Sequence, residues 1–463
     1  MSIPNTHFGA EEISKILKNC KSIYFIGIGG INMSSLAHIS RKRGFITGGS
    51  DRVRTALTER LENSGIRINY SHEKENVHGY GAVVYTVAIS ADNPEYVEAQ
   101  RLGIPCISRA DFLGYVMTGY RRRIGVSGMH GKSTCTSMCA SVFIGAEASP
   151  TVLSGAELDI MGGAYTIGDG EDFIFEACEY MDSFLDFNPT VAVVLNVEMD
   201  HVDYFHSMEQ IRKSFYDYVS ITGEDGYAVA NADDAEVSKA LANYSGTLVT
   251  FGIETENCNF RAANIVCGKG RYSFDVEKNG VFLCRIQLSV TGYHNVYNAL
   301  ACAAAADLCG ISAEAISKGL SAFRGAKRRM EYKGSFCGAE LYDDYGHHPT
   351  EVRTTLNGAE GLAEKRLICV FQPHTYSRTK ELFGEFAAAF EAADKVLLSD
   401  IYAARETDDG TVSSAMLAEA IGGKAVYCGT LTQTAEVLRR EMSAGDTVVV
   451  MGAGDIYKIF DMI

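Results

Sequence analysis

The sequence lacks any apolar run of about 18 residues, the length at which a helix becomes a candidate membrane span. Its N-terminus also lacks a basic stretch followed by an apolar one. We therefore expect neither export nor membrane insertion, and a cytoplasmic protein. The 13 cysteines include no C-x-x-C pair and no His/Cys ligand spacing. This scatter excludes a disulfide framework and a structural zinc site, and it fits a reducing compartment.

Basic residues are in the minority, since 42 Lys and Arg face 58 Asp and Glu and the formal net charge is -16. This balance excludes a nucleic-acid surface and attraction to anionic membranes. Any basic residue that holds an anionic ligand must therefore act locally. With 463 residues the chain exceeds the size of a single core, and its 46% hydrophobic and 22% charged residues are typical of globular proteins. We expect about two to four domains.

An apolar strand runs into a glycine-rich turn in the segment 124–134, I-G-V-S-G-M-H-G-K-S-T. Backbone N–H groups of such a turn, at a helix N-terminus, bind phosphate oxygens, while Lys132 reaches the terminal phosphates and the Ser133 hydroxyl ligates Mg²⁺. A standard loop has glycine five residues before Gly131, where this chain has Val126, and Gly128 stands closer instead. The turn predicts an ATP site with a shortened loop; the alternative is an ordinary strand-turn-helix corner.

The first and last parts of the chain alternate short apolar strands with helices. Near the N-terminus we expect strands at 22–26 and 82–87 and a helix at about 34–43. After about residue 327 we expect strands at 367–371, 395–398 and 447–451, again separated by helices. This pattern predicts a doubly wound α/β domain at each end of the chain.

The middle part follows a basic cluster at 121–123, which we interpret as a linker. Continuous apolar runs at 172–175 and 191–197 predict buried strands of a parallel sheet, and 208–221 has the spacing of an amphipathic helix. Short alternating strands with Lys-Gly and Asn-Gly turns between about 247 and 290 predict an antiparallel appendage. An Ala-rich helix is expected at 295–308.

A second glycine turn, with Gly27, Gly29 and Gly30, follows the first predicted strand. Such a turn is typical of dinucleotide sites, in which an acid about 20 residues later, here Asp51, binds ribose hydroxyls. Asn32 occupies the place of the third glycine, so an oxidoreductase ranks last among the alternatives. A diphosphate of another kind could still bind the N–H groups of this turn.

Candidate metal ligands follow two strands of the middle part. Glu176 comes after the strand at 172–175, and His201 follows the strand at 191–197, with Asp200 beside it. Carboxyl ends of parallel strands meet at one edge of a sheet, so these side chains and Ser133 should lie beside the phosphate loop. Taken singly, each could be an ordinary surface charge or a hydrogen-bonded histidine. Glu179 and Asp182 are nearby acids to which the sequence gives no role.

The last part contains a dense polar stretch, D-D-Y-G-H-H-P-T-E at 343–351. Its acids, phenol and imidazoles suit proton transfer or charge clamping. Two tandem histidines could also bind a metal, but adjacent residues of an extended chain point to opposite faces. Arg378 follows the strand at 367–371, and its planar fork suits a carboxylate. The alternative for Arg378 is a surface ion pair.

These motifs together resemble the Mur ligase family. The resemblance rests on G-I-G-G-I-N-M-S, G-M-H-G-K-S-T, E-A-C-E-Y-M-D-S-F followed by N-V-E-M-D-H, and G-Y-H-N-V-Y-N-A-L-A followed by G-A-K-R-R-M and D-D-Y-G-H-H-P-T-E-V. It extends from about residue 20 to the C-terminal G-A-G-D. It implies an α/β fold of three domains: a Rossmann-like UDP-sugar domain (1–121), a central P-loop ATPase-like domain with a mostly parallel sheet and an antiparallel appendage (122–326), and a Rossmann-like amino-acid domain (327–463).

Within the family, the chain is most similar to members that attach the first amino acid of the peptidoglycan precursor. The resemblance implies UDP-N-acetylmuramate, L-alanine and ATP as substrates, Mg²⁺ as cofactor and an acyl-phosphate intermediate. It implies a catalytic set of Lys132, Arg329, Asp344 and His347, and an ATP site of Gly128, His130, Gly131, Lys132, Ser133, Thr134, His294, Asn295, Asn298 and Arg329. It further implies metal ligands Ser133, Glu176 and His201, UDP-sugar contacts at Gly27, Gly29, Gly30 and Asp51, and amino-acid contacts at Tyr345, His347 and Arg378.

The resemblance leaves several points open. Some relatives carry a second Arg three residues before the position of Arg378, where this chain has Thr375. Several use a carbamylated lysine, and Lys213 receives no such assignment. A recycling ligase that adds a whole peptide has similar motifs, and an ATP-binding regulatory protein would not need Glu176 or His201. The oligomeric state and the preference for alanine over glycine or serine also stay open.

Overall fold

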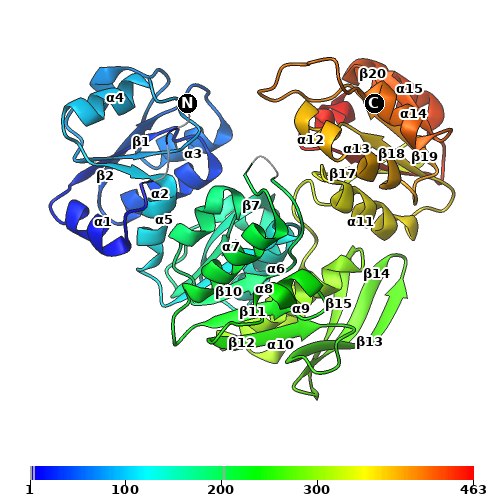
Figure 1. The fold of residues 1–463 in the computed structure, drawn as a ribbon, viewed down its shortest axis with the longest axis horizontal. Helices are drawn as coiled ribbons and strands as arrows, with labels where there is room; N and C mark the ends of the chain where they lie inside the picture. Colours follow the sequence, from blue (N-terminus) through cyan, green and yellow to red (C-terminus); the bar gives the residue numbers. More distant parts are fainter. Residues whose placement is uncertain (1–2, 4–5, 202–203) are drawn as a thin grey trace. The chain divides into compact units, whose positions relative to one another are not determined.

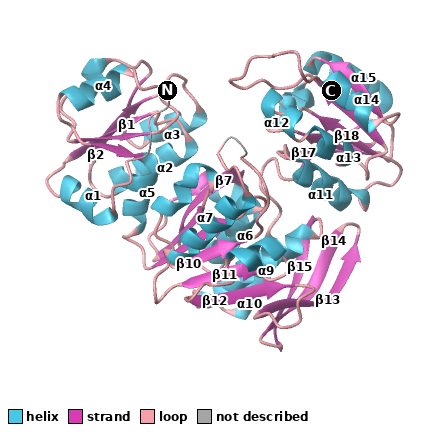
Figure 2. Ribbon diagram, in the orientation of Figure 1, coloured by secondary structure: helices cyan, strands magenta, loops and turns pink. Residues whose placement is uncertain are grey.

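The computed structural model describes residue 3 and residues 6–201 and 204–463. The chain divides into two compact units, Met1–Phe260 with Ala301–Ser312 and Arg261–Leu300 with Ala313–Ile463. The strands form three sheets, and each sheet is accompanied by helices (Figures 1 and 2). In the part of the chain that is described, no helix has the length and apolar character of a membrane span.

The N-terminal sheet has the order β3-β2-β1-β4-β5, and its paired strands are parallel. Its strands are β1 (Ser22–Ile26), β2 (Ile46–Ser50), β3 (Arg67–Asn69), β4 (Ala82–Tyr85) and β5 (Cys106–Ser108), and its helices α1 (Ala10–Leu17), α2 (Ile31–Lys42), α3 (Ala56–Asn63), η1 (Lys74–Val77), α4 (Pro94–Arg101) and α5 (Arg109–Met117). Alternate residues of β1 enter different cores: Phe25 packs with residues of α2 and α5, and Tyr24 with Ala99 of α4. The predicted strand at 22–26 is confirmed, whereas α2 begins three residues before the predicted helix.

The central sheet has ten strands in the order β15-β14-β13-β12-β11-β10-β6-β9-β7-β8. They are β6 (Arg122–Ser127), β7 (Thr151–Leu158), β8 (Gly163–Thr166), β9 (Asp172–Glu176), β10 (Val191–Val194), β11 (Tyr227–Asn231), β12 (Thr247–Gly252), β13 (Phe260–Gly268), β14 (Arg271–Lys278) and β15 (Val281–Thr291). The helices of this region are α6 (Lys132–Gly145), η2 (Asp159–Met161), η3 (Tyr180–Asp186), α7 (Met208–Ser220), α8 (Ala235–Ala240), α9 (His294–Leu308) and α10 (Ala313–Ala322). Strands β6, β9, β10 and β11 pair in parallel, and β14 pairs with β15 in antiparallel fashion.

Two predictions for this region are wrong. Strand β12 pairs in parallel with β11, so the segment 247–252 belongs to the parallel part of the sheet and not to an antiparallel appendage. The basic cluster is not a free linker, because Arg122 and Arg123 begin β6. Arg122 makes a bidentate pair with the fully buried Asp172 of β9, at 2.5 and 2.9 Å. This pair joins two neighbouring strands, which is why so polar a segment enters a sheet.

The C-terminal sheet has the order β16-β17-β21-β18-β19-β20, in which β16 is antiparallel to β17 and the other pairs are parallel. Its strands are β16 (Glu331–Phe336), β17 (Ala339–Asp344), β18 (Leu367–Phe371), β19 (Lys395–Ser399), β20 (Ala425–Gly429) and β21 (Thr447–Met451), and its helices α11 (Pro349–Glu360), α12 (Tyr376–Glu381), α13 (Phe383–Ala388), α14 (Ser414–Ile421), α15 (Leu431–Glu441) and η4 (Ile456–Asp461). Alternate residues of β18 enter different hydrophobic cores, as in a doubly wound domain. The fold is thus the predicted α/β class with three sheets.

Candidate functional site

The glycine-rich turn lies between β6 and α6, as the sequence predicts. Gly128 and Gly131 adopt positive φ angles of 136° and 85°, which favour glycine. A Cβ on Gly128 would stand 3.1 Å from the backbone nitrogen of Asn196, so the turn approaches the end of β10 closely. Asn196 fixes it there by accepting from the His130 N–H at 2.8 Å and donating to the His130 carbonyl at 2.9 Å. Lys132, Ser133 and Thr134 follow in the first turn of α6.

Lys132 is held by an acid to which the sequence gave no role. Its Nζ lies 3.0 Å from the carboxylate of Glu179 and donates to the carbonyls of Gly128 and Met129 at 2.6 and 3.0 Å. The Lys132 side chain is only 12% exposed and that of Glu179 is fully buried. Burial alone would lower the pKa of Lys132, but the negative charge of Glu179 raises it above its ordinary value. Lys132 is therefore a buried, positively charged group at the start of α6.

Glu179 also connects Lys132 with His201. The Nε2 atom of His201 lies 3.2 Å from a carboxylate oxygen of Glu179. His201 has a φ angle of 51°, an uncommon conformation for a residue other than glycine that is often found at functional sites. Burial raises the pKa of Glu179, but Lys132 and His201 outweigh this and lower it. The carboxylate is thus ionised between two nitrogen groups.

Ser133 and Glu176 meet at the end of β9. The Ser133 hydroxyl donates to Glu176 at 2.8 Å, and the N–H of Gly155 donates to the same oxygen at 3.0 Å. Strand β9 pairs with β6 so that Glu176 lies opposite Val126, which brings its side chain to the phosphate-binding turn. A hydroxyl and a carboxylate are oxygen ligands of the kind that Mg²⁺ prefers. These two residues fit a magnesium site. His201 contacts Glu179, which also pairs with Lys132.

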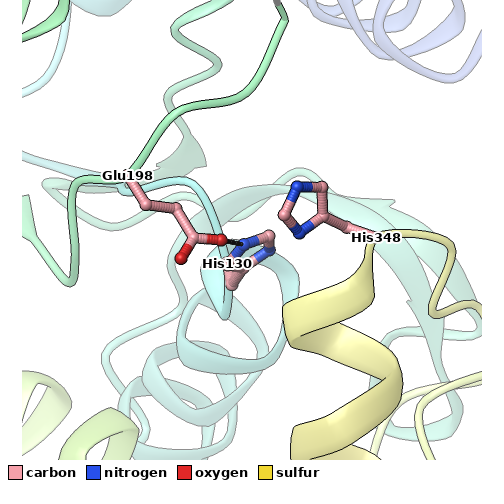
Figure 3. Close-up of side chains that lie close together, drawn as sticks. All are labelled: His130, Glu198 and His348. Carbon is pink, nitrogen blue, oxygen red and sulfur yellow. Dashed lines mark hydrogen bonds and ion pairs between the residues drawn. The ribbon is translucent and has the colours of Figure 1, made fainter. Parts of the chain in front are cut away.

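A further acid lies beside the turn. The imidazole of His130 hydrogen-bonds the carboxylate of Glu198, which follows β10 (Figure 3). The same figure shows His348, which belongs to the second compact unit and caps the N-terminus of α11. The His348 side chain accepts from the N–H of Thr350 at 3.3 Å. The sequence did not single out Glu198, because its partner His130 lies 68 positions earlier in the chain.

The other glycine turn, between β1 and α2, opens into a cavity of about 730 Å³ in the first unit. Gly27 and Gly30 line this cavity together with Asp51, and Gly27 has a φ angle of 81°. Asp51 accepts from the N–H of Gly29 at 2.8 Å, and a Cβ on Gly29 would stand 2.7 Å from that carboxylate oxygen. Asp51 therefore shapes the turn as well as lining the cavity, and the N–H of Gly29 is already bonded.

A buried network supports the same cavity. Glu95 is fully buried and accepts hydrogen bonds from Tyr24 at 2.8 Å, Ser50 at 2.6 Å and Asn76 at 2.8 Å. Its carboxylate also lies 2.7 Å from Nδ1 of His72, which lines the cavity. No motif marks Glu95 or His72 in the sequence, because the members of this network come from separate elements of the sheet.

The second compact unit contains the remaining predicted residues, in two groups. At the start of α9, Asn298 donates to Asn295 at 2.9 Å, and Asn295 donates to the carbonyl of Thr291 at 2.7 Å. Both asparagines are buried. His294 precedes them, and burial lowers its pKa to about 4, so its imidazole is neutral at pH 7. The three residues stand near the start of α9.

The second group follows β17. Asp344 accepts from the N–H groups of Gly346 and Met330 at 2.8 and 2.9 Å. Arg329 lies over the ring of Tyr345, with 5.3 Å between its guanidinium carbon and the ring centroid. Burial lowers the pKa of His347 to about 4.

Glu351 and His374, which sequence analysis did not assign, complete this group. Glu351 lies 3.9 Å from Arg329 and 3.4 Å from His347. Arg378 contacts Nδ1 of His374 at 3.4 Å, and the rings of His374 and His347 are 5.9 Å apart. His374 thus contacts both Arg378 and His347.

Comparison with known proteins identifies the family. Residues 22–121 match the model described as Mur ligase family, catalytic domain; residues 126–306 match the Mur ligase middle domain; and residues 328–454 match the Mur ligase, glutamate ligase domain. A UDP-N-acetylmuramate–L-alanine ligase of Caldanaerobacter subterraneus subsp. tengcongensis is 45% identical over 447 residues, which cover 96% of this chain and 97% of that protein.

Solved structures show the same relationship. The crystal structure of UDP-N-acetylmuramate-alanine ligase MurC from Thermotoga maritima has a TM-score of 0.78 and 29% identity, and the match covers 95% of this chain and 97% of that one. A murein peptide ligase from Psychrobacter arcticus shares the fold, with a TM-score of 0.70 and 24% identity over 95% of this chain and 97% of that one. The family matches along the sequence and the 45% identity over nearly its whole length show that the chain belongs to the Mur ligase family.

Proposed function

We propose that this chain joins L-alanine to the lactyl carboxylate of UDP-N-acetylmuramate, with conversion of ATP to ADP and phosphate. The observation that carries the proposal is the group of Lys132, Ser133, Glu176 and His201 at the phosphate-binding turn. The similarity to ligases of that name over 96% of the chain supports the choice of substrates. Sugar nucleotide and ATP place the reaction in the cytoplasm, in the synthesis of peptidoglycan precursors.

In the proposed division of labour, residues 1–121 hold the sugar nucleotide, 122–326 hold ATP and 327–463 hold the amino acid. The turn at Gly27, Gly29 and Gly30 receives the diphosphate. Asn295, Asn298 and His294 contact ATP, and Arg329 and Asp344 support it. Tyr345, His347 and Arg378 receive the amino acid, with Arg378 as the partner of its carboxylate.

The reaction proceeds in two steps. The lactyl carboxylate attacks the γ-phosphate of ATP, ADP leaves, and an acyl phosphate forms. Lys132 and the N–H groups of the turn stabilise the charge on the transferring phosphoryl group. The amine of alanine then attacks the acyl carbon, and the tetrahedral intermediate releases phosphate and a proton to give the amide. Ser133, Glu176 and His201 would hold Mg²⁺, which when bound neutralises charge on the phosphates.

A turnover assay tests this function. Phosphate release is measured with UDP-N-acetylmuramate, Mg²⁺-ATP and either free L-alanine or a tripeptide. We expect release with alanine, and release with the tripeptide alone would identify a recycling ligase instead. Lys132→Ala should abolish turnover, whereas Lys239→Ala should not, because Lys239 is exposed and pairs only with Glu236 among the described residues. If neither acceptor causes phosphate release, the alternative of an ATP-binding regulatory protein would be favoured.

A further inference from the structure

Arg109 is a cation of the first unit that none of the predicted motifs includes. It is the first residue of α5, directly after Ser108, whose side chain caps the helix by accepting from the N–H of Asp111 at 3.3 Å. Arg109 lines the cavity of about 730 Å³ into which the glycine turn at Gly27 and Gly30 opens. Its position on a capped helix, rather than on a loop, fixes where its side chain leaves the backbone.

Among the described residues, no carboxylate pairs with the guanidinium of Arg109. Within residues 6–201 and 204–463, no carboxylate oxygen comes within the 4.0 Å ion-pair distance of it. Asp186, whose charge acts on Arg109, pairs with His7 at 2.9 Å instead. Arg109 is only partly exposed, and burial lowers its pKa. A desolvated cation without a partner is costly, and a bound anion would remove that cost.

Arg109 also lies towards the phosphate-binding region. Helix α5 packs against η3, which begins directly after Glu179. The approach is close: a Cβ on Gly114 of α5 would stand 2.1 Å from the carbonyl oxygen of Asp186 at the end of η3. Arg109 therefore lines the cavity of the glycine turn from a helix that packs against the segment after Glu179.

We propose that Arg109 binds the lactyl carboxylate of the sugar nucleotide and makes this carboxylate the group by which the enzyme recognises its substrate. The inference rests on the proposed function, which requires the substrate to extend from the glycine turn to the γ-phosphate. A carboxylate that approaches the phosphates of ATP meets like charge. The planar fork of an arginine can hold both carboxylate oxygens, offset part of this repulsion and orient the attacking oxygen.

The test compares two sugar nucleotides by isothermal titration calorimetry without ATP. UDP-N-acetylmuramate carries the lactyl carboxylate, and UDP-N-acetylglucosamine has the same uridine, diphosphate and amino sugar without it. We expect Arg109→Gln to weaken binding of the first by about 10- to 100-fold, the usual effect of losing a charged hydrogen bond, and to change binding of the second less than about twofold. Arg109→Lys should recover part of the loss. Arg101→Gln is the matched control, since Arg101 of the same unit pairs with Glu98 at 2.7 Å and is not among the residues that line the cavity.

Two results would overturn the inference. Equal losses for both nucleotides would assign Arg109 to the diphosphate, and unchanged affinities with an unchanged unfolding temperature would leave it without a ligand. Failure of the proposed function looks different. In that case the wild-type protein itself would show no preference for UDP-N-acetylmuramate and no phosphate release with alanine. A wild-type protein that shows both, with an Arg109→Gln variant that keeps the preference, would refute the role of Arg109 alone.

Discussion

The ion pair between Lys132 and Glu179 gives the sharpest prediction about the phosphate-binding turn. The perturbation is a double-mutant cycle of Lys132→Met, Glu179→Gln and the variant with both changes. Both side chains are buried and their charged atoms are 3.0 Å apart. Removing one partner of a buried pair leaves the other charge without compensation, which costs about 3–5 kcal/mol. Removing both leaves no uncompensated charge, so the double variant should be more stable than the sum of the single changes.

The structure sets the magnitude near the lower end of that range for Glu179→Gln. Lys132 retains its hydrogen bonds to the carbonyls of Gly128 and Met129, and the new amide oxygen can still accept from it. We expect a loss of about 3 kcal/mol, which for a domain of this size corresponds to roughly 6–12 °C in the unfolding temperature. The coupling between the two positions should be at least about 1 kcal/mol.

Differential scanning calorimetry at pH 7 without nucleotide measures the cycle. A second series with saturating ADP adds the functional link, because phosphate oxygens can replace the carboxylate as partners of Lys132. The stability lost in Glu179→Gln should then be partly restored by ADP, beyond the stabilisation that ADP gives the wild-type protein. Strictly additive effects of the two substitutions, or an equal shift by ADP in wild type and variant, would refute the reasoning.

The remaining predictions concern three other positions. Ser133→Ala, which removes the hydroxyl beside Glu176, should weaken the apparent Mg²⁺ affinity in the turnover assay by about 10- to 100-fold, and an unchanged Mg²⁺ titration would contradict this. Asp51→Asn should lower the free energy of unfolding, measured in urea, by about 1 kcal/mol, because the N–H of Gly29 loses a charged acceptor. Thr47→Val, in the same sheet, is the comparison variant. Burial lowers the pKa of His294 to about 4 in the folded protein. The stability that the neutral imidazole contributes is therefore fully present above pH 6.5 and is lost as the pH falls towards 4, because the unfolded chain binds the proton first. His294→Gln should remove up to about 3 kcal/mol of that pH dependence in unfolding experiments.

Strands that carry one uninterrupted apolar run could be predicted from the sequence to the residue. Leu367–Phe371 and Thr447–Met451 are β18 and β21, and every residue of both is buried. Their boundaries are sharp because Arg366 and Gln372 adjoin β18, and Asp446 and Gly452 adjoin β21. Helix starts were less accurate. Helix α2 begins at Ile31, directly after the glycine turn, where neither the glycines nor Asn32 gives a helix signal.

The candidate site also contains residues that the sequence predicts and residues that it does not. Lys132, Ser133 and Glu176 could be predicted, because the local pattern of strand, glycine turn and helix determines where they lie. Glu179 could not receive a role, since its contact with Lys132 joins positions 47 residues apart and depends on the path of η3. Met181 and Asp182 have left-handed backbone angles within η3, and no residue there marks such a bend in the sequence.

Lys132 and Arg109, two cations of the first unit, differ in whether a protein anion pairs with them, which sequence motifs do not indicate. Lys132, which the motif singles out, already has an anion, and a phosphate that reaches it must exchange with Glu179. Arg109, which no motif singles out, has none among the described residues, so an anion that reaches it forms a pair where none existed. Exchange lowers the net gain of binding, because the displaced carboxylate needs a new partner. Removal of the Glu179 charge should therefore strengthen binding of metal-free ADP, measured by calorimetry in EDTA, whereas weaker binding would show that Glu179 positions Lys132 rather than competing for it.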